Sequence, residues 1–92
     1  MLYNMIIMKA DLHNHSHYSD GALSPREVVK LARDAGCDLI SLTDHDTTNG
    51  ILEAQLEADK LAINLVNGVE ISAFWRNSVI HIIGLGVDIN ND

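Results

Sequence analysis

Blocks of apolar and polar positions divide the first part of the chain into a strand, a loop and the start of a helix. Residues 5–12 are mostly apolar and predict a first strand that is largely buried. Residues 13–23 are rich in His, Ser, Asn and Gly and predict a polar loop. A helix should follow, because Ser24 can cap free amides, Pro25 suits the first helical turn and Glu27 can complete a capping box.

Apolar residues recur in this helix at the spacing of one helical face. The predicted buried face consists of Val28, Leu31, Ala32 and Ala35. These positions are i, i+3, i+4 and i+7, so their side chains share one side of the helix. Gly36 follows and predicts left-handed backbone that ends the helix.

The next segments repeat the order of strand and helix. Residues 38–42 predict a second strand, residues 43–48 a polar turn, and residues 49–62 a second helix. The inward-facing residues of that helix are expected to be Ile51, Ala54, Ala58, Leu61 and Ala62. Two more strands are expected near residues 65–72 and 79–87. The order β-α-β-α-β predicts an α/β fold with a parallel sheet covered by helices.

The last two strands are too close in sequence for a parallel connection. Only residues 73–78 separate them, and a parallel crossover needs about a dozen residues or more. We therefore expect an antiparallel hairpin. A symmetric turn between Trp75 and Arg76 would place Glu70 directly opposite His81, with Cβ atoms about 4.5–5.5 Å apart.

Composition and charge narrow the class of protein. The 92 residues are 47% hydrophobic and 21% charged, which is typical of a globular domain and excludes a disordered or collagen-like chain. The formal net charge of −7 disfavours binding to duplex nucleic acid through bulk charge. No apolar run approaches the ~20 residues of a membrane span, and residues 1–8 lack a basic leader. With one Cys in the chain, these features predict a cytoplasmic protein without a membrane partner.

Histidines and acidic residues stand at or near the ends of the predicted strands. His13 and His15 follow the first strand, and in extended backbone they project from one face about 6–7 Å apart. The full set of candidate metal ligands is His13, His15, Asp20, His45, Glu70 and His81. Because α/β folds place their sites at the carboxyl ends of strands, we expect these side chains to converge.

The types of these side chains indicate a metal centre. Imidazole and carboxylate together suit Mn²⁺, Zn²⁺ or Fe²⁺ better than Ca²⁺ or Mg²⁺. Six candidate ligands exceed the need of one tetrahedral ion, so we expect two or three ions, with Glu70 as a bridge. Clustered ions activate a bound water and reverse the local negative charge, so a small phosphorylated substrate could dock. Phosphoester hydrolysis fits this chemistry best.

Several other positions leave two interpretations open. Asp11 and Asp44 either orient the imidazoles of His13 and His45 or are solvated turn residues. The predicted hairpin tip, residues 74–76, is either a surface on which a substrate stacks or a plain exposed turn.

The motifs around these residues resemble the polymerase-and-histidinol-phosphatase (PHP) family. They are ADLHNHS at 10–16, SDG at 19–21, LTDHDTTNG at 42–50, GVEIS at 68–72 and IHIIGL at 80–85. The tandem of Asp-Gly-x-Leu-Ser-Pro and Thr-Asp-His-Asp-Thr is similar to the TrpH-like phosphoesterase branch. The resemblance implies activity on nucleoside 3′,5′-bisphosphates or, in some members, on RNA 5′ ends.

The resemblance also implies a ligand grouping and a fold. By this resemblance, His13 and His15 would hold one ion, and Glu70 would bridge to a second ion held by His81. Asp20 and His45 would hold a third ion. The family fold is a distorted barrel of seven β/α units, and a full β/α barrel needs on the order of 200 residues. Residues 1–92 are therefore expected to be a single partial domain, the N-terminal portion of that barrel. Further family ligands, a later His and an Asp-x-His pair, have no counterpart before Asp92.

The sequence thus predicts a metal-dependent phosphoesterase, with residues 1–92 alone inactive. Two alternatives remain, a metal-binding or interaction module without turnover and a polymerase-associated PHP module. Unpaired strand edges and an apolar face predict self-association of the chain.

Overall fold

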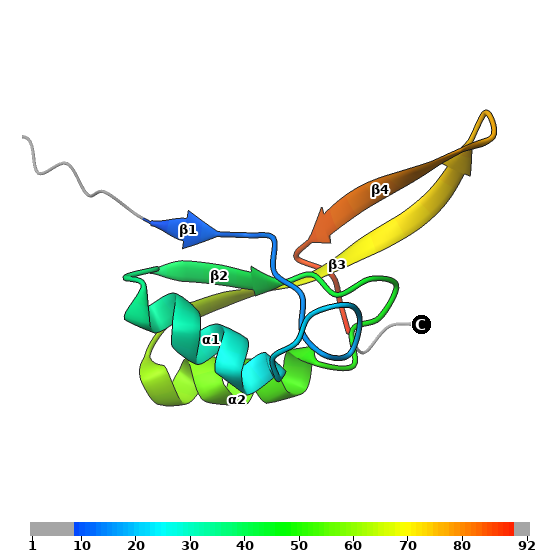
Figure 1. Cartoon of the computed structure of the whole chain (residues 1–92). Coiled ribbons are helices and arrows are strands. Elements are labelled where there is room, and N and C mark those ends of the chain that lie inside the picture. Colours follow the sequence, from blue (N-terminus) through cyan, green and yellow to red (C-terminus); the bar gives the residue numbers. More distant parts are fainter. Residues whose placement is uncertain (1–8, 90–92) are drawn as a thin grey trace, which may run out of the picture.

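Residues 9–89 are described in the computed structural model, and they form one mixed sheet with two helices (Figure 1). The elements in chain order are β1 (Ala10–Asp11), α1 (Pro25–Asp34), β2 (Leu39–Leu42), α2 (Ile51–Leu61), β3 (Asn64–Trp75) and β4 (Ser78–Leu85). The strand order is β1-β2-β3-β4, with β1, β2 and β3 parallel and β4 antiparallel to β3. The predicted α/β order and terminal hairpin are confirmed. Part of the predicted first strand, residues 5–8, lies outside the described residues.

Helix α1 begins and ends where its sequence predicts. The Ser24 hydroxyl accepts a hydrogen bond from the Glu27 amide at 3.1 Å, and the Glu27 carboxylate accepts one from the Ser24 amide at 3.2 Å. Gly36 has a φ of 85°, and the amides of Gly36 and Cys37 donate to carbonyls of the last helical turn at 2.9 and 3.0 Å. The capping box and the left-handed glycine are both confirmed.

The buried face of α1 differs from the prediction. Val28 and Ala32 are buried as expected, but Val29 is fully buried, Leu31 is 60% exposed and Ala35 is exposed. The reason is that α1 packs against both α2 and β2, which rotates its contact stripe toward Val29 (Figure 1). The spacing of apolar residues alone does not define which neighbours a helix meets.

In α2, three of the five predicted inward residues are buried. Ile51, Ala54 and Ala58 are buried, and Leu61 is partly buried. Ala62 was expected inside but is exposed, because it adopts left-handed backbone (φ 57°) and ends the helix. Most of the α2 core residues meet α1 and β2 in one cluster, made of Val28, Val29, Ala32, Ile40, Leu42, Ala54, Ala58 and Ile63. No helix in residues 9–89 has the length and apolar character to span a bilayer.

The hairpin turn lies one residue further along the chain than predicted. Arg76 and Asn77 have φ of 51° and 65° and form a two-residue turn, so that Trp75 pairs with Ser78. Two successive left-handed residues match the twist of an antiparallel pair, which favours this turn over a symmetric one between Trp75 and Arg76.

The predicted register is therefore wrong. Glu70 lies opposite Ile83, and His81 lies opposite Ser72. Because the pairing moved by two positions, Glu70 and His81 still project from the same face of the hairpin as diagonal neighbours.

Candidate metal centre

The structure brings all six predicted ligands together at one end of the sheet. They come from the segment after β1 (His13, His15), the loop before α1 (Asp20), the turn after β2 (His45), β3 (Glu70) and β4 (His81). Glu70 lies where β3 passes from β2 to β4, and it forms a parallel bridge with His45. The carboxyl ends of β1 and β2 therefore lie next to the carboxylate of Glu70, because β3 is longer and continues beyond both strands.

Glu70 is the centre of the cluster. It is only 4% exposed, and each of its two oxygens faces two imidazoles. Oε1 lies 2.6 Å from Nε2 of His13 and 3.1 Å from Nε2 of His15. Oε2 lies 3.1 Å from Nδ1 of His45 and 3.1 Å from Nδ1 of His81.

Asp20 joins two of the same rings from the exposed side. Its Oδ1 lies 2.6 Å from Nδ1 of His15, and its Oδ2 lies 3.0 Å from Nε2 of His45. The centroids of the His15 and His45 rings are 4.3 Å apart. Both rings therefore stand between two carboxylates.

Hydrogen bonds alone satisfy the contacts between the imidazoles and the carboxylates poorly, whereas bound metal ions would satisfy them well. A neutral imidazole has one N–H, but both nitrogens of His15 and of His45 face carboxylate oxygens. If all four contacts were hydrogen bonds, two imidazolium ions would stand side by side. Divalent ions that accept lone pairs from the imidazoles and carboxylates remove this conflict, and the donor set suits Zn²⁺, Mn²⁺ or Fe²⁺.

The ligand atoms fall into three overlapping groups. These are His13–His15–Glu70, His15–Asp20–His45 and His45–Glu70–His81, and the ligand atoms within each lie within 4.8 Å of one another. The first and third groups share only Glu70, through different oxygens. Two metal ions could therefore occupy these two groups at the same time, because no imidazole would have to bind both ions.

Both carboxylates are held in the ionised form that a ligand needs. Burial raises the pKa of Glu70, but hydrogen bonds with His13 and His15 and the charge of nearby His45 outweigh it, so the pKa is lowered. The hydrogen bond with His15 is the main cause of a lowered pKa at Asp20. Because both pKa values are lowered, the carboxylates of Glu70 and Asp20 are ionised at neutral pH.

The two neighbouring acids differ in burial: Asp11 is exposed, as one of the two interpretations expected, whereas Asp44 is buried. Asp11 accepts a hydrogen bond from the backbone amide of His13 at 3.4 Å, so it contacts the backbone of that ligand. Asp44 is 1% exposed, and its carboxylate turns to the loop that contains Ser16 and Ser19 instead of to the ring of His45. Sequence reasoning missed these two serines, although each stands next to a predicted ligand.

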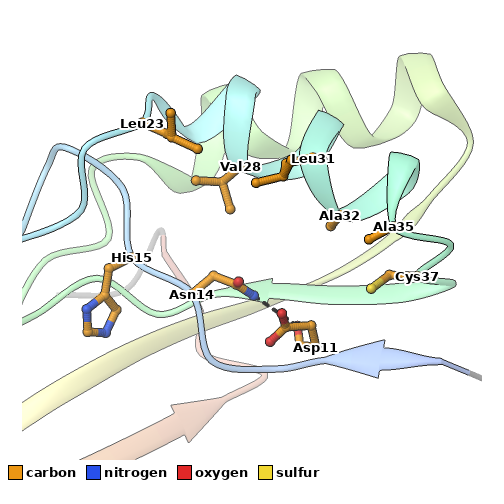
Figure 2. Close-up of a pocket in the computed structure, with 9 residues that line it drawn as sticks. All are labelled: Asp11, Asn14, His15, Leu23, Val28, Leu31, Ala32, Ala35 and Cys37. Atoms are coloured by element: carbon orange, nitrogen blue, oxygen red, sulfur yellow. Dashed lines mark hydrogen bonds between the residues drawn. The ribbon is translucent and has the colours of Figure 1, made fainter.

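A separate apolar hollow lies beside the centre. It has a volume of about 290 Å³ and is bounded by α1 side chains on one side and by Asp11 and Asn14 on the other (Figure 2). Figure 2 shows the ring of His15 pointing away from the α1 side chains. His15 lines the hollow and is also a candidate metal ligand, so the hollow and the candidate metal centre adjoin at this residue.

Comparison with known proteins gives consistent matches. Residues 11–87 match the PHP domain family. A 3′,5′-nucleoside bisphosphate phosphatase from Chromobacterium violaceum is 49% identical over 78 residues, which are 85% of this chain and 27% of that protein. A 5′-3′ exoribonuclease from Haemophilus influenzae is 50% identical over 80 residues, 87% of this chain and 29% of that protein.

Solved structures agree with these sequence matches. A protein from Bifidobacterium adolescentis, described as a metal-dependent phosphoesterase, superposes with a TM-score of 0.81 at 33% identity. The match covers 85% of this chain and 27% of that protein. The chain spans less than a third of the length of these three relatives.

Proposed function

Because this chain belongs to the PHP domain family, we propose that its six-residue cluster binds divalent metal ions and serves the hydrolysis of phosphate esters. One observation carries the proposal. A buried carboxylate, Glu70, faces four imidazole nitrogens at 2.6–3.1 Å. The chain supplies the first strands and helices of a PHP barrel, and residues 1–92 form a single partial domain of it.

The proposed ions are two or three, of Mn²⁺, Zn²⁺ or Fe²⁺. His13 and His15 hold one with Oε1 of Glu70, and His45 and His81 hold another with Oε2. A third position lies between Asp20 and His15 or His45. When bound, such ions supply an acidic water and a positive field for the oxygens of a phosphoryl group.

The residues of the chain prepare the site for that chemistry. Ionised Glu70 forms the buried floor, while His13, His81 and Asp20 have side chains that are 58%, 51% and 64% exposed and form the open side. A substrate therefore approaches over His13 and His81 and meets Glu70 last. Because the chain has a net charge of −7, an anionic substrate needs the bound cations to approach this acidic centre.

The substrate class we propose is a small nucleotide phosphate ester. A nucleoside 3′,5′-bisphosphate or an RNA 5′ end is supported by the activities of the Chromobacterium and Haemophilus relatives. A cytoplasmic location is part of the proposal and is supported by a chain with one Cys.

A chimera tests hydrolysis directly. Residues 11–87 replace the corresponding segment of the Chromobacterium phosphatase, with which this chain is 49% identical. We expect the folded chimera to release inorganic phosphate from a nucleoside 3′,5′-bisphosphate with added Mn²⁺. Glu70→Gln should abolish this release, whereas His17→Ala, which changes an exposed side chain of the same loop, should not. A folded chimera that binds Mn²⁺ and stays inactive would contradict the hydrolase.

A second candidate is metal binding without turnover by residues 1–92. The observation that favours it is the span of the chain, 27–29% of the relatives' length. The same phosphate assay on the 92-residue chain, together with metal analysis, separates the two. We expect bound metal and no phosphate release from the 92 residues.

A further inference from the structure

A buried carboxylate next to the metal centre accepts three hydrogen bonds from one loop. Asp44 is 1% exposed and Ser16 is fully buried. Oδ1 of Asp44 accepts from the Ser16 amide at 2.5 Å and from the Ser19 hydroxyl at 2.9 Å. Oδ2 accepts from the Ser16 hydroxyl at 2.7 Å.

Each residue in this set stands next to a proposed ligand in the sequence. Ser16 follows His15, Ser19 precedes Asp20, and Asp44 precedes His45. The three hydrogen bonds, one from a backbone amide and two from serine hydroxyls, therefore join the loop that contains His15 and Asp20 to the turn that contains His45.

Two further features hold the same loop in place. The Thr43 amide donates to the Asn14 carbonyl at 2.7 Å, and the Asn14 amide donates to the Thr43 hydroxyl at 3.1 Å. The Gly21 amide donates to the Ser16 carbonyl at 3.0 Å, and a Cβ at Gly21 would collide with the His15 carbonyl. The loop is thus closed on itself and fastened to the end of β2.

Burial makes the three hydrogen bonds obligatory. A carboxyl group without solvent is stable only if hydrogen bonds satisfy its oxygens, and serine hydroxyls and an amide supply them here. Any displacement of the loop would leave Asp44 unsatisfied, so the carboxylate resists movement of Ser16 and Ser19.

We infer that Asp44 is a positioning residue, whose bonds to Ser16 and Ser19 hold His15 and Asp20 opposite His45 before an ion binds. The inference rests on the proposed metal centre. Its effect is to reduce the reorganisation that metal binding requires, so the loss of Asp44 should appear in metal affinity.

Titration of the metal-free protein with Zn²⁺ by calorimetry tests this role. Asp44→Asn keeps both hydrogen bonds to Oδ1 and can donate to the Ser16 hydroxyl, so its Zn²⁺ affinity should stay within about threefold of the unmodified protein. Asp44→Ala loses all three bonds, and its affinity should fall by about tenfold or more. If Asn weakens binding as much as Ala, charge instead of positioning is responsible and the inference is wrong.

A matched serine pair keeps the test decisive if Asp44→Ala does not fold. Ser19→Ala removes one hydroxyl hydrogen bond to Asp44, and Ser24→Ala removes one at the α1 cap, where the hydroxyl accepts from the Glu27 amide and not from a residue of the Asp44 set. We expect weaker Zn²⁺ binding for Ser19→Ala only. Equal affinities for both variants would overturn the inference, whereas no Zn²⁺ binding by the unmodified protein would instead overturn the proposed metal centre.

Discussion

At the scale of single residues, substitution of Glu70 is predicted to have the largest effect on metal binding. Its two oxygens each face two imidazoles, so it joins the two ligand groups that can be filled together. The amide of Gln can make hydrogen bonds to these rings but is a poor ligand for Mn²⁺ or Zn²⁺ beside imidazole.

The prediction for Glu70→Gln concerns stabilisation by metal. An ion at 100 times its Kd stabilises the folded state by about 2.7 kcal/mol. For a domain of this size the Tm of the unmodified protein should then rise by about 10 °C or more. Calorimetric scans with and without Zn²⁺ should show this rise, and Glu70→Gln should lose most of it. An equal rise in both proteins would contradict the bridging role.

Gly21 is a second residue with a sharp prediction. A Cβ at this position collides with the His15 carbonyl, so Gly21→Ala must displace the ligand loop. We expect a loss of about 1–3 kcal/mol in the free energy of unfolding, together with weaker metal binding. The matched control is Gly84→Ala, where the nearest atom, a methyl of Val87, is 3.5 Å away. Urea unfolding that shows equal effects for both variants would disprove the steric account.

The convergence of the candidate residues could be predicted because the ends of parallel strands meet at one edge and because the hairpin places His81 of β4 beside Glu70 of β3. The roles of the acids beside them could not. Asp44 was expected to orient His45 or to be solvated, yet it is buried against Ser16 and Ser19. Sequence spacing predicts which residues follow the end of a strand. It does not predict which other loop packs against them, because that depends on tertiary contacts.

At the scale of elements, α1 shows the strongest agreement between sequence and structure. Its ends are local features, since Ser24, Glu27 and Gly36 interact within a few residues of the helix. The face it buries is not local, and Leu31 was placed wrongly because α2 shares the packing. The hairpin register was wrong for a related reason, because Arg76 and Asn77 select a turn type that hydrophobic spacing does not reveal.

The α1 cap gives a prediction with a pH dependence. The hydrogen bonds with Ser24 lower the pKa of Glu27 below its usual 4.5. A lowered folded pKa means that the stabilisation is complete above pH 4.5 and is lost as the pH falls through the folded pKa. Glu27→Ala, which removes the carboxylate that accepts from the Ser24 amide, should therefore lower the free energy of unfolding near neutral pH and have less effect in acid.

Urea unfolding of Glu27→Ala and the unmodified protein at neutral pH and at about pH 3 measures this difference. Ser24→Ala is the control, because it removes the hydroxyl that accepts from the Glu27 amide but keeps the Ser24 amide that donates to the Glu27 carboxylate. Its cost of about 1 kcal/mol should therefore change less with pH. A cost of Glu27→Ala that is the same at both pH values would show that the ionised Glu27 takes no part in the cap.

At the scale of the whole molecule, the β3–β4 hairpin extends away from the helices (Figure 1). Large apolar residues on it are exposed, namely Ile71, Phe74, Val79, Ile80, Ile82, Ile83 and Leu85. Residues 71, 80 and 82 lie on one face and 74, 79, 83 and 85 on the other, so exposed apolar side chains occur on both faces. The second face also carries Glu70 and His81. β1 and β4 are the outer strands of the sheet.

These features predict that the chain self-associates in solution. Light scattering over a range of concentrations should show species larger than a monomer. Replacing Ile80 and Ile82 with Thr should shift the distribution toward monomer, whereas Leu52→Thr, on the exposed side of α2, should not. A monodisperse monomer at every concentration would contradict the prediction.

The metal centre itself is tested most directly by anomalous diffraction from crystals grown with Mn²⁺ or Zn²⁺. The account predicts anomalous peaks at about 2.0–2.2 Å from imidazole nitrogens and carboxylate oxygens of the cluster. One peak should lie between His13, His15 and Glu70, and another between His45, Glu70 and His81. Crystals that contain the metal but show no peak within bonding distance of Glu70 would contradict it.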